Sequence, residues 1–378
     1  MRDIMQAALS GVVKAAVVVA LSSFSFAGLA QDRAPAPDDG LLSIANDKLT
    51  LGMRTQGGSM VRLVLNDDPD KVNPMHTGLG HFVCVDGFGP VSTEERNAGL
   101  PGHGEAHRVP WDVVSSEKKN GATTVSLSAT LPLVQEKFRR TLRLIDGENV
   151  VYIDSELENL LAFDRPINWG EHATIGPPFL EPGKTVVEMS AIRAKTRAHS
   201  DQSPQPPHRL ASSREFSWPM APGLNGETID VRPVPADAKY GDHTTSLMDA
   251  RRRLVFVTAF HTDKRVLLGY VFRREEYPWT QLWESYPGDD RLARGLEFAT
   301  QPFDVPRREV IQTNAMFETP TYRWLPAKSS ISSAFLMFYT RVPAGFRKVD
   351  DVVVEGGKVT IFDRTSAVRI ELAASRPL

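Results

Sequence analysis

Apolar and polar residues alternate with a period of two along most of this chain, which limits the folds that it can adopt. In residues 123–131, TTVSLSATL, the larger apolar side chains occupy every second position, so they lie on one face of an extended strand. Residues 141–160 contain two such runs. Dipeptides typical of tight hairpin turns occur at three places: Asn120-Gly121, Asp146-Gly147 and Gly356-Gly357. The pattern predicts antiparallel hairpins.

Further segments show the same strand pattern, and long helical periodicity is absent. These segments are residues 254–261, 266–273, 334–342, 352–357, 358–363 and 368–373. Without a parallel strand-helix-strand rhythm, we expect an all-β fold of large antiparallel sheets packed face to face. We predict a single sandwich domain over residues 43–378. The polar, proline-rich segment at about 195–242 is interpreted as a surface excursion, and a domain boundary there is the alternative.

The first thirty residues have the pattern of a secretory signal peptide. Lys14 precedes an apolar run, and small residues lead up to Gln31. We expect cleavage after Ala30 and a periplasmic or secreted protein. An uncleaved membrane anchor is the alternative, but the apolar run is short and interrupted by serines. Residues 31–42 are expected to form a disordered leader.

Charge and cysteine content narrow the function classes. The chain has a net charge of −2, and removal of residues 1–30, with Arg2, Asp3 and Lys14, leaves −3. Acidic and basic residues are interspersed, which favours neither nucleic acid nor stable membrane association as a partner. The single cysteine, Cys84, cannot form an internal disulfide and is expected to be a buried apolar residue. Phosphate loops and dinucleotide fingerprints are absent, so we expect no cofactor.

Three stretches combine turn residues with ionisable groups, and the first is residues 97–111, NAGLPGHGEAHRVPW. It contains His103, Glu105 and His107, a set that could bind a metal in a lyase or hydrolase. A zinc-protease helix, however, needs two histidines four residues apart with the glutamate directly after the first. Here Glu105 stands two residues after His103, and Gly104 disfavours a helix. We therefore expect no metal site.

The second stretch is residues 167–180, INWGEHATIGPPFL, which contains His172. Gly170, Gly176 and the Pro177-Pro178 pair predict a shaped loop that is neither a regular helix nor a regular strand. Loops carry functional residues more often than cores do. His172 is therefore either a functional residue or a turn residue bonded to nearby backbone.

The third stretch is residues 292–304, LARGLEFATQPFD, in which Glu297 lies between apolar neighbours. Such a glutamate either faces solvent from a strand or is a desolvated carboxylate. Desolvation raises the pKa of a carboxylate, as a general base requires. Serine-nucleophile chemistry is not indicated, because the chain contains no Gly-x-Ser-x-Gly elbow.

Taken together and in this order, the three stretches resemble the aldose 1-epimerase (galactose mutarotase-like) family. PGHGEAHRVPW is similar to the His-Gly segment of the family, ELENLLAFDRPINWGEHATIGPPFL to its second-histidine segment, and LEFATQPF to its catalytic-glutamate segment. The resemblance spans roughly residues 45–345. It implies a large antiparallel β super-sandwich that binds a small carbohydrate on a concave sheet.

The resemblance also implies roles for three residues. Mutarotation opens the pyranose ring, so a base must take the anomeric hydroxyl proton while an acid protonates the ring oxygen. By resemblance, Glu297 is the catalytic base and His172 the catalytic acid. His103 is implied to hydrogen-bond the ring or a hydroxyl group.

Other candidate substrate contacts accompany these three residues. Trp169, Trp279 and Trp283 flank two of the stretches, and a flat indole can cover the apolar face of a pyranose. Core packing is the alternative for these tryptophans. Residues within or beside the stretches complete the predicted binding set: His107, Glu171, Gln301 and, for the additional substrate-binding arginine of the family, Arg96.

The fold itself does not decide the function. An exported mutarotase-like isomerase is the leading hypothesis. A carbohydrate-binding protein of the same fold without catalysis is the first alternative, motivated by the altered HGEAH stretch. A metal-dependent lyase or hydrolase is the second.

Overall fold

Twenty-eight strands and two short helices make up the part of the chain that the structure describes, residues 40–199 and 207–378. The structure is a computed structural model. The predicted signal peptide and most of the predicted leader lie outside the described residues. Every strand pairing within the sheets is antiparallel, so the all-β prediction is confirmed.

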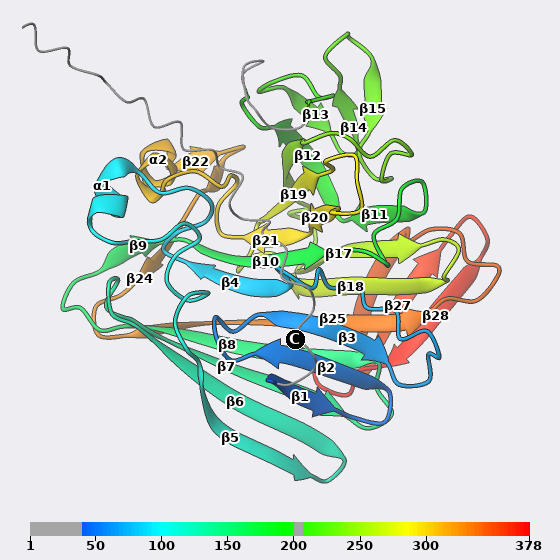
Figure 1. The fold of residues 1–378 in the computed structure, drawn as a ribbon, viewed down its shortest axis with the longest axis horizontal. Coiled ribbons are helices and arrows are strands. Elements are labelled where there is room, and N and C mark those ends of the chain that lie inside the picture. Colours follow the sequence, from blue (N-terminus) through cyan, green and yellow to red (C-terminus); the bar gives the residue numbers. More distant parts are fainter. Residues whose placement is uncertain (1–39, 200–206) are drawn as a thin grey trace, which may run out of the picture. The chain divides into compact units, whose positions relative to one another are not determined.

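The first large sheet has eleven strands and contains the segments that carry the candidate residues. Its order is β1 (Leu41–Ala45), β2 (Leu49–Arg54), β3 (Met60–Leu65), β4 (His81–Val85), β10 (Trp169–Ile175), β20 (Ala293–Gly295), β19 (Trp279–Ser285), β16 (His243–Met248), β12 (Ala191–Thr196) and β13 (Glu215–Ser217). The eleventh strand, β21 (Glu297–Ala299), pairs with β10 and β19. Segments more than a hundred residues apart in sequence thus lie side by side (Figure 1).

The second large sheet has eight strands. Its order is β11 (Thr185–Met189), β17 (Leu254–His261), β18 (Val266–Arg273), β25 (Ser330–Arg341), β8 (Val150–Asn159), β7 (Glu136–Ile145), β6 (Ala122–Leu131) and β5 (Asp112–Lys119). The predicted turn at Asn120-Gly121 connects β5 to β6, with positive φ at both residues, as a tight hairpin turn requires. The turn containing Asp146-Gly147 connects β7 to β8.

Apolar side chains from both large sheets form one core between them. On the eleven-stranded sheet, Phe298 of β21 is fully buried, and its ring stacks on Phe272 of β18 with centroids 4.4 Å apart. Phe335 of β25 lies 5.1 Å from the same ring. Burial of one such side chain contributes about 1.5–3 kcal/mol. The inward face of β21 is thereby fixed, so its other face points away from the core.

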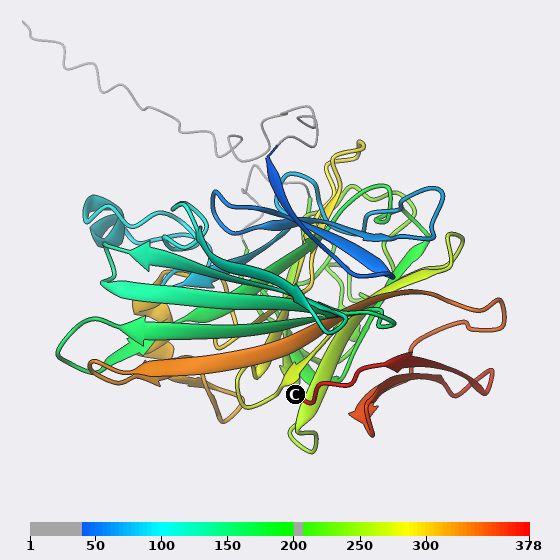
Figure 2. The ribbon, with the colours of Figure 1, turned by 90° about the horizontal axis from the view of Figure 1, so that it is seen from below.

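A third layer covers part of the outer face of the eight-stranded sheet. It consists of β26 (Asp351–Glu355), β27 (Lys358–Asp363) and β28 (Val368–Ala373), with the predicted Gly356-Gly357 turn between the first two. Val352 and Ile361 of this layer pack in one apolar cluster with Phe256 and Phe338. Figure 2 shows these strands in red against the eight-stranded sheet.

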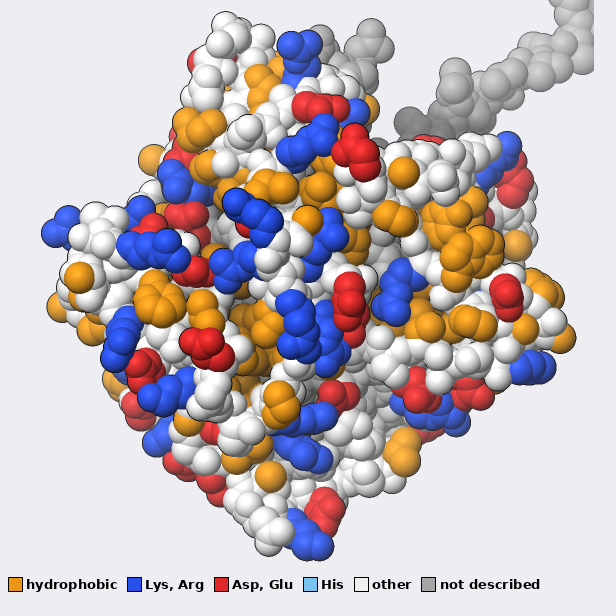
Figure 3. Space-filling view, turned by 180° about the vertical axis from the view of Figure 1, so that it is seen from behind, with side chains coloured by type: hydrophobic (Ala, Val, Ile, Leu, Met, Phe, Trp, Pro, Cys, Tyr) orange, Lys and Arg blue, Asp and Glu red, His pale blue; other side chains and the backbone are white. Residues whose placement is uncertain are grey.

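Short elements complete the described structure. They are α1 (Thr93–Asn97), α2 (Arg307–Thr313), β9 (Arg165–Ile167) paired with β24 (Arg323–Leu325), β14 (Met220–Pro222) paired with β15 (Thr228–Asp230), and β22 (Ala315–Met316) paired with β23 (Thr319–Pro320). In the proline-rich segment, Leu210, Ala221 and Val231 form a small core of their own. No helix within residues 40–199 and 207–378 is long and apolar enough to cross a membrane. Acidic and basic side chains are interspersed on the face in Figure 3.

One prediction about local structure is wrong. Residues 169–175 form the regular central strand β10, with all seven residues buried, and only the residues after it leave the strand. The two prolines at 177 and 178 follow the strand, so they remove no hydrogen bond from it. The glycine at position 170 makes room for the ring of Phe88 on the strand, because a Cβ at Gly170 would lie 2.4 Å from Phe88 Cε2.

Candidate active site

The structure brings the two predicted catalytic residues into contact. Register between β10 and β21 pairs Glu171 with Phe298, so His172 and Glu297 are neighbours on the opposite face. His172 Nε2 lies 3.3 Å from Glu297 Oε1, and the two side chains are 8% and 2% exposed. Gly295 leaves room for this carboxylate, because a Cβ there would lie 2.3 Å from Glu297 Oε1.

Neighbouring side chains hold the imidazole of His172 in place. Its Nδ1 lies 3.0 Å from Thr174 Oγ1, two residues along the same strand face. Phe82 of β4 stacks on the ring at 4.4 Å with an interplanar angle of 16°. The half-buried Trp283 of β19 packs at 6.2 Å in a T-shaped arrangement. The predicted contact Trp283 therefore lies beside the pair.

The first stretch supplies two more imidazoles. His103 has a positive φ of 65°, and its ring centroid lies 5.1 Å from that of His172. Its Nδ1 accepts a hydrogen bond from Gly89 N at 3.1 Å, which leaves the proton of the neutral ring on Nε2. His107 lies 5.9 Å from His103 and 5.1 Å from Phe82. The three histidines thus surround Phe82, and His103 is oriented as a donor through Nε2.

Burial makes the imidazoles neutral and the carboxylate basic. Desolvation lowers the pKa of His172 well below its ordinary range, that of His103 to about 4, and that of His107 to about 3. Desolvation also raises the pKa of Glu297 well above its ordinary value, and the negative charge of Asp304 raises it further. Both shifts favour the uncharged form of the pair, in which the shared proton is on Glu297 and His172 is neutral.

A second polar group, which the sequence analysis missed, lies on the other side of Glu297. It contains Arg197 after β12, His243 of β16, Gln281 of β19 and Asp304 after β21. Gln281 is directly opposite Glu297 in the sheet register, and its side chain contacts His243. The only sequence signal for this group was that Asp304 ends the third stretch.

The positions predicted for Trp169 and Glu171 require correction. Alternation along β10 directs both side chains into the core, away from the face of His172, and both are fully buried. Glu171 Oε2 lies 2.9 Å from His81 Nε2, and its Oε1 lies 2.5 Å from Arg140 Nη2. Trp169 Nε1 donates to the same carboxylate. These residues belong to a buried network between the sheets and do not contact a sugar on the histidine face.

The remaining predicted contacts also lie away from the pair. Gln301 is fully buried, and its Nε2 donates to Phe303 O at 2.6 Å, which stabilises the loop after β21. Trp279 is buried and donates from Nε1 to Pro320 O. Arg96 is exposed on α1, and α1 lies apart from β21 (Figure 1). Within the described residues, no hydrogen bond or ion pair joins the Arg96 side chain to the pair.

The first stretch does not form a metal centre in the described structure. Glu105 is buried and accepts a hydrogen bond from Val134 N at 2.9 Å, so its carboxylate is engaged with the backbone of another loop. Across residues 40–199 and 207–378, no group of three or more His, Cys, Asp or Glu side chains is arranged to hold a metal ion. Cys84 is fully buried and unpaired, as expected.

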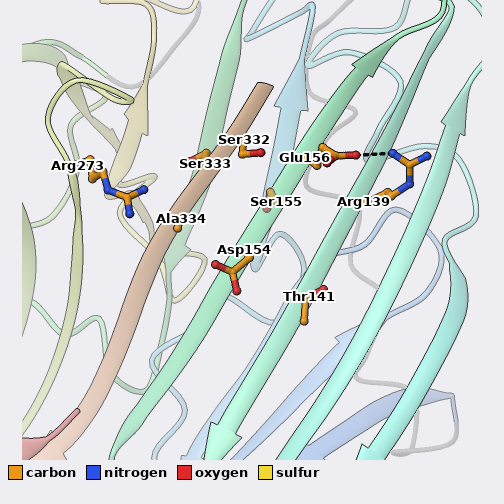
Figure 4. A pocket seen from close by; sticks show the side chains of 9 residues that line it. All are labelled: Arg139, Thr141, Asp154, Ser155, Glu156, Arg273, Ser332, Ser333 and Ala334. Carbon is orange, nitrogen blue, oxygen red and sulfur yellow. Dashed lines mark hydrogen bonds and ion pairs between the residues drawn. The ribbon is translucent and has the colours of Figure 1, made fainter. Parts of the chain in front are cut away.

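A hollow of about 450 Å³ on the outer face of the eight-stranded sheet is separate from this site. Its lining is polar, and Figure 4 shows Arg139 paired with Glu156. The two atoms of this ion pair, Arg139 Nη1 and Glu156 Oε1, are 2.5 Å apart. Asp154 in the same hollow is paired with Arg376. Because these charges are already paired and no aromatic face lines the hollow, it offers no comparable chemistry.

The fold matches known structures although the sequence does not. No protein-family model and no curated protein sequence matches the chain. A galactose mutarotase related enzyme from Lactobacillus acidophilus is similar with a TM-score of 0.55 at 14% identity, over 80% of this chain and 98% of that chain. A galactose mutarotase-like protein from Clostridium acetobutylicum is similar with a TM-score of 0.56 at 14% identity, over 80% of this chain and 95% of that chain. A candidate aldose 1-epimerase from Escherichia coli K12 is similar with a TM-score of 0.56 at 13% identity, over 80% of this chain and 99% of that chain. The chain therefore has the all-β fold of galactose mutarotase-like proteins.

Proposed function

We propose that this protein is an aldose 1-epimerase-like isomerase that interconverts the anomers of a small sugar. The observation that carries the proposal is the 3.3 Å contact between His172 Nε2 and Glu297 Oε1. The anomeric oxygen and the ring oxygen of a pyranose are bonded to the same carbon. An acid and a base that serve both oxygens must therefore be adjacent, as these two groups are.

The reaction needs only proton transfer between sugar and protein. The reactive form is the ionised one, in which the shared proton has passed from Glu297 to His172. The Glu297 carboxylate then takes the proton of the anomeric hydroxyl while protonated His172 gives a proton to the ring oxygen. The bond between the anomeric carbon and the ring oxygen breaks, and an open-chain aldehyde forms. Rotation about the adjacent carbon–carbon bond and the reverse proton transfers close the ring as the other anomer. In the reactive form, Glu297 and His172 together hold one proton that can be transferred. Activity should therefore fall when the pair gains a second proton or loses the first, which gives a bell-shaped pH dependence.

Two neighbouring groups suit a sugar ligand. His103 is oriented to donate from Nε2, which a ring oxygen or hydroxyl group can accept. Trp283 is half-buried beside His172 and offers an indole to the apolar face of a pyranose. Both roles belong to the same proposal.

Polarimetry on freshly dissolved α-glucose, α-galactose and other aldoses tests the proposal. We expect purified protein to accelerate the approach to anomeric equilibrium for at least one sugar. Absence of acceleration with every aldose would contradict it.

A carbohydrate-binding protein without catalysis is the second candidate. The observation that favours it is the near-complete burial of Glu297 and His172, which a sugar can reach only if neighbouring groups move. Calorimetric binding of a sugar without anomer exchange would support this candidate against the isomerase.

We also propose export to the periplasm or the medium. The support is the pattern of residues 1–30, with an apolar run followed by small residues. N-terminal sequencing of the protein recovered from cell fractions tests it, and a mature chain beginning at Gln31 is expected. An intact N-terminus on a membrane-bound chain would instead support the anchor.

A further inference from the structure

A chain of polar contacts on the β16 and β19 side of Glu297 has no role in the proton transfers above. Arg197 Nη1 lies 2.5 Å from Asp304 Oδ1, and Arg197 Nη2 donates to Asp304 O at 3.1 Å. Arg197 Nη1 also lies 3.2 Å from His243 Nδ1. Asp304 therefore holds the guanidinium through both its side chain and its backbone.

His243 links this ion pair to the strand beside Glu297. Its Nδ1 also lies 3.2 Å from Asp304 Oδ1, and its Nε2 lies 3.0 Å from Gln281 Oε1. Gln281 Nε2 donates to Gln301 O at 3.3 Å. The side chains of Asp304, His243 and Gln281 are thereby held in one connected group.

The chain of contacts reaches both sides of the candidate site. Gln281 lies opposite Glu297 in the register of β19 and β21. Asp304 also packs tightly on Gly89, where a Cβ would lie 2.5 Å from Asp304 Cβ. Gly89 is the residue whose N–H orients His103. Asp304 thus packs directly on the residue that orients His103 and reaches Gln281, the neighbour of the base, through His243.

We propose that Asp304, held by Arg197, is a positioning residue that sets the orientation and charge environment of Glu297 and His103. The inference rests on the proposed isomerase function, in which Glu297 is the base. Asp304 itself contacts no reacting atom in this scheme.

The charges around Glu297 make the inference testable. His172 of β10 contacts Glu297, and Cys84 of β4, Arg197 and Asp304 interact with it electrostatically. The next titratable groups outward are His103 and His107, which act on His172, and His243, which acts on Asp304. Beyond burial, Asp304 raises the pKa of Glu297, whereas Arg197 lowers it. The two members of one ion pair therefore act on the base with opposite sign.

Asp304→Asn and Arg197→Gln should shift the pH optimum of kcat/KM in opposite directions. Loss of the negative charge lowers the pKa of Glu297 and moves the optimum to lower pH. Loss of the positive charge moves it to higher pH. Because both variants also loosen the support of the base, kcat should fall by up to about 10²-fold, with a smaller change in KM.

The exposed ion pair of Asp289 and Arg291, 2.7 Å apart, provides a matched control. Asp289→Asn and Arg291→Gln make the same chemical changes away from the site and should leave the pH optimum in place. Shifts of the two site variants in the same direction, or no shift, would overturn the inference, because a merely structural role has no reason to depend on the sign of the charge.

A measurement independent of activity separates this inference from the proposed function. The carboxyl ¹³C resonance of Glu297, assigned by its absence in Glu297→Gln, should titrate at lower pH in Asp304→Asn and at higher pH in Arg197→Gln. If the wild type shows these titrations but no mutarotation, the positioning role stands and the proposed function fails. If Asp304→Asn does not fold, Arg197→Gln decides alone, since one third of the Arg197 side chain is exposed.

Discussion

Two buried glutamate–histidine pairs lie back to back across β10, and only one of them includes a cation. On the inward face, Glu171 contacts His81 at 2.9 Å and Arg140 at 2.5 Å. On the outward face, Glu297 contacts His172 at 3.3 Å, and no lysine or arginine among the described residues forms an ion pair with it. Both pairs consist of a buried glutamate and a buried histidine, so they differ in the arginine, which contacts only Glu171.

This difference reverses the acid–base behaviour of the two carboxylates. Burial alone would raise the pKa of Glu171, yet Arg140 and His81 bring it below its ordinary value. Burial raises the pKa of Glu297 well above that value, and Asp304 adds to the effect. A buried carboxylate paired with arginine is held in its ionised form, whereas one without a cation favours its protonated form and is suited to proton transfer.

Removal of the outward carboxylate should have the largest effect on activity. Glu297→Gln keeps the shape of the side chain but cannot take a proton, so the mutarotation rate should fall by about 10²–10⁴-fold with little change in sugar affinity. His172→Asn should behave similarly. Polarimetry beside a thermal melt checks this, with Glu275→Gln on the exposed surface as the matched control. An unchanged rate with a lowered melting temperature would make Glu297 structural.

Removal of the inward cation should affect stability most. Arg140→Met leaves Glu171 as a buried charge without its guanidinium partner, which should lower the free energy of unfolding by about 3–5 kcal/mol. Arg139→Met, one residue earlier on β7 and 42% exposed, should cost no more than about 1 kcal/mol. Urea denaturation of both variants gives the comparison. If Arg140→Met lost as little unfolding free energy as is expected for Arg139→Met, the inward network would not stabilise the sandwich.

The sequence predicted the strands and the outward pair better than the two faces of β10. Period-two patterns and turn dipeptides identified the hairpins, since each is a local feature. His172 and Glu297 were found through their stretches and the family resemblance. Trp169 and Glu171 were misassigned because a strand directs neighbouring residues to opposite faces, and the glycine and prolines of that stretch had argued against a strand.

The group around Asp304 could not be found from the sequence for a different reason. Arg197, His243 and Gln281 come from three separate strand segments, which become neighbours only through the order of the eleven-stranded sheet. Arg197 and His243 lie at opposite ends of the proline-rich segment at about 195–242, outside the three stretches that the sequence singles out. Contacts of this kind depend on strand pairing between distant segments, which a single sequence does not specify.

The pH dependence of stability should distinguish the two carboxylates by sign. The pKa of Glu297 is raised above its ordinary value of 4.5, so the folded chain binds this proton more tightly than the unfolded chain does. The contribution of Glu297 to stability is therefore lost as the pH rises from 4.5 toward the raised pKa. Glu297→Gln should therefore gain stability relative to wild type with rising pH. Glu171, with a lowered pKa, loses its contribution as the pH falls below 4.5, so Glu171→Gln should gain relative stability with falling pH.

Urea denaturation at a series of pH values measures both trends against wild type. Because His172 contacts Glu297, the difference between wild type and Glu297→Gln reports the titration of the pair as a whole. If both variants gained stability relative to wild type in the same direction of pH, the Arg140 cation would not be what distinguishes the pKa values of the two carboxylates.

The smallest expected effect concerns His103, whose contact with the outward pair is indirect. Its ring is oriented by Gly89 N and lies 5.1 Å from His172, so its proposed role is to hold the sugar through one neutral hydrogen bond. His103→Ala should raise KM roughly fivefold, in line with the 0.5–1.5 kcal/mol of such a bond, and lower kcat less than Glu297→Gln does. His76→Ala is the control, because the side-chain hydrogen bonds of His76 in the described structure are to its own turn, at Gly78 N and Leu79 N. If His103→Ala lowered kcat as strongly as Glu297→Gln while KM stayed constant, His103 would take part in proton transfer, and the outward face would carry two acid–base histidines instead of one.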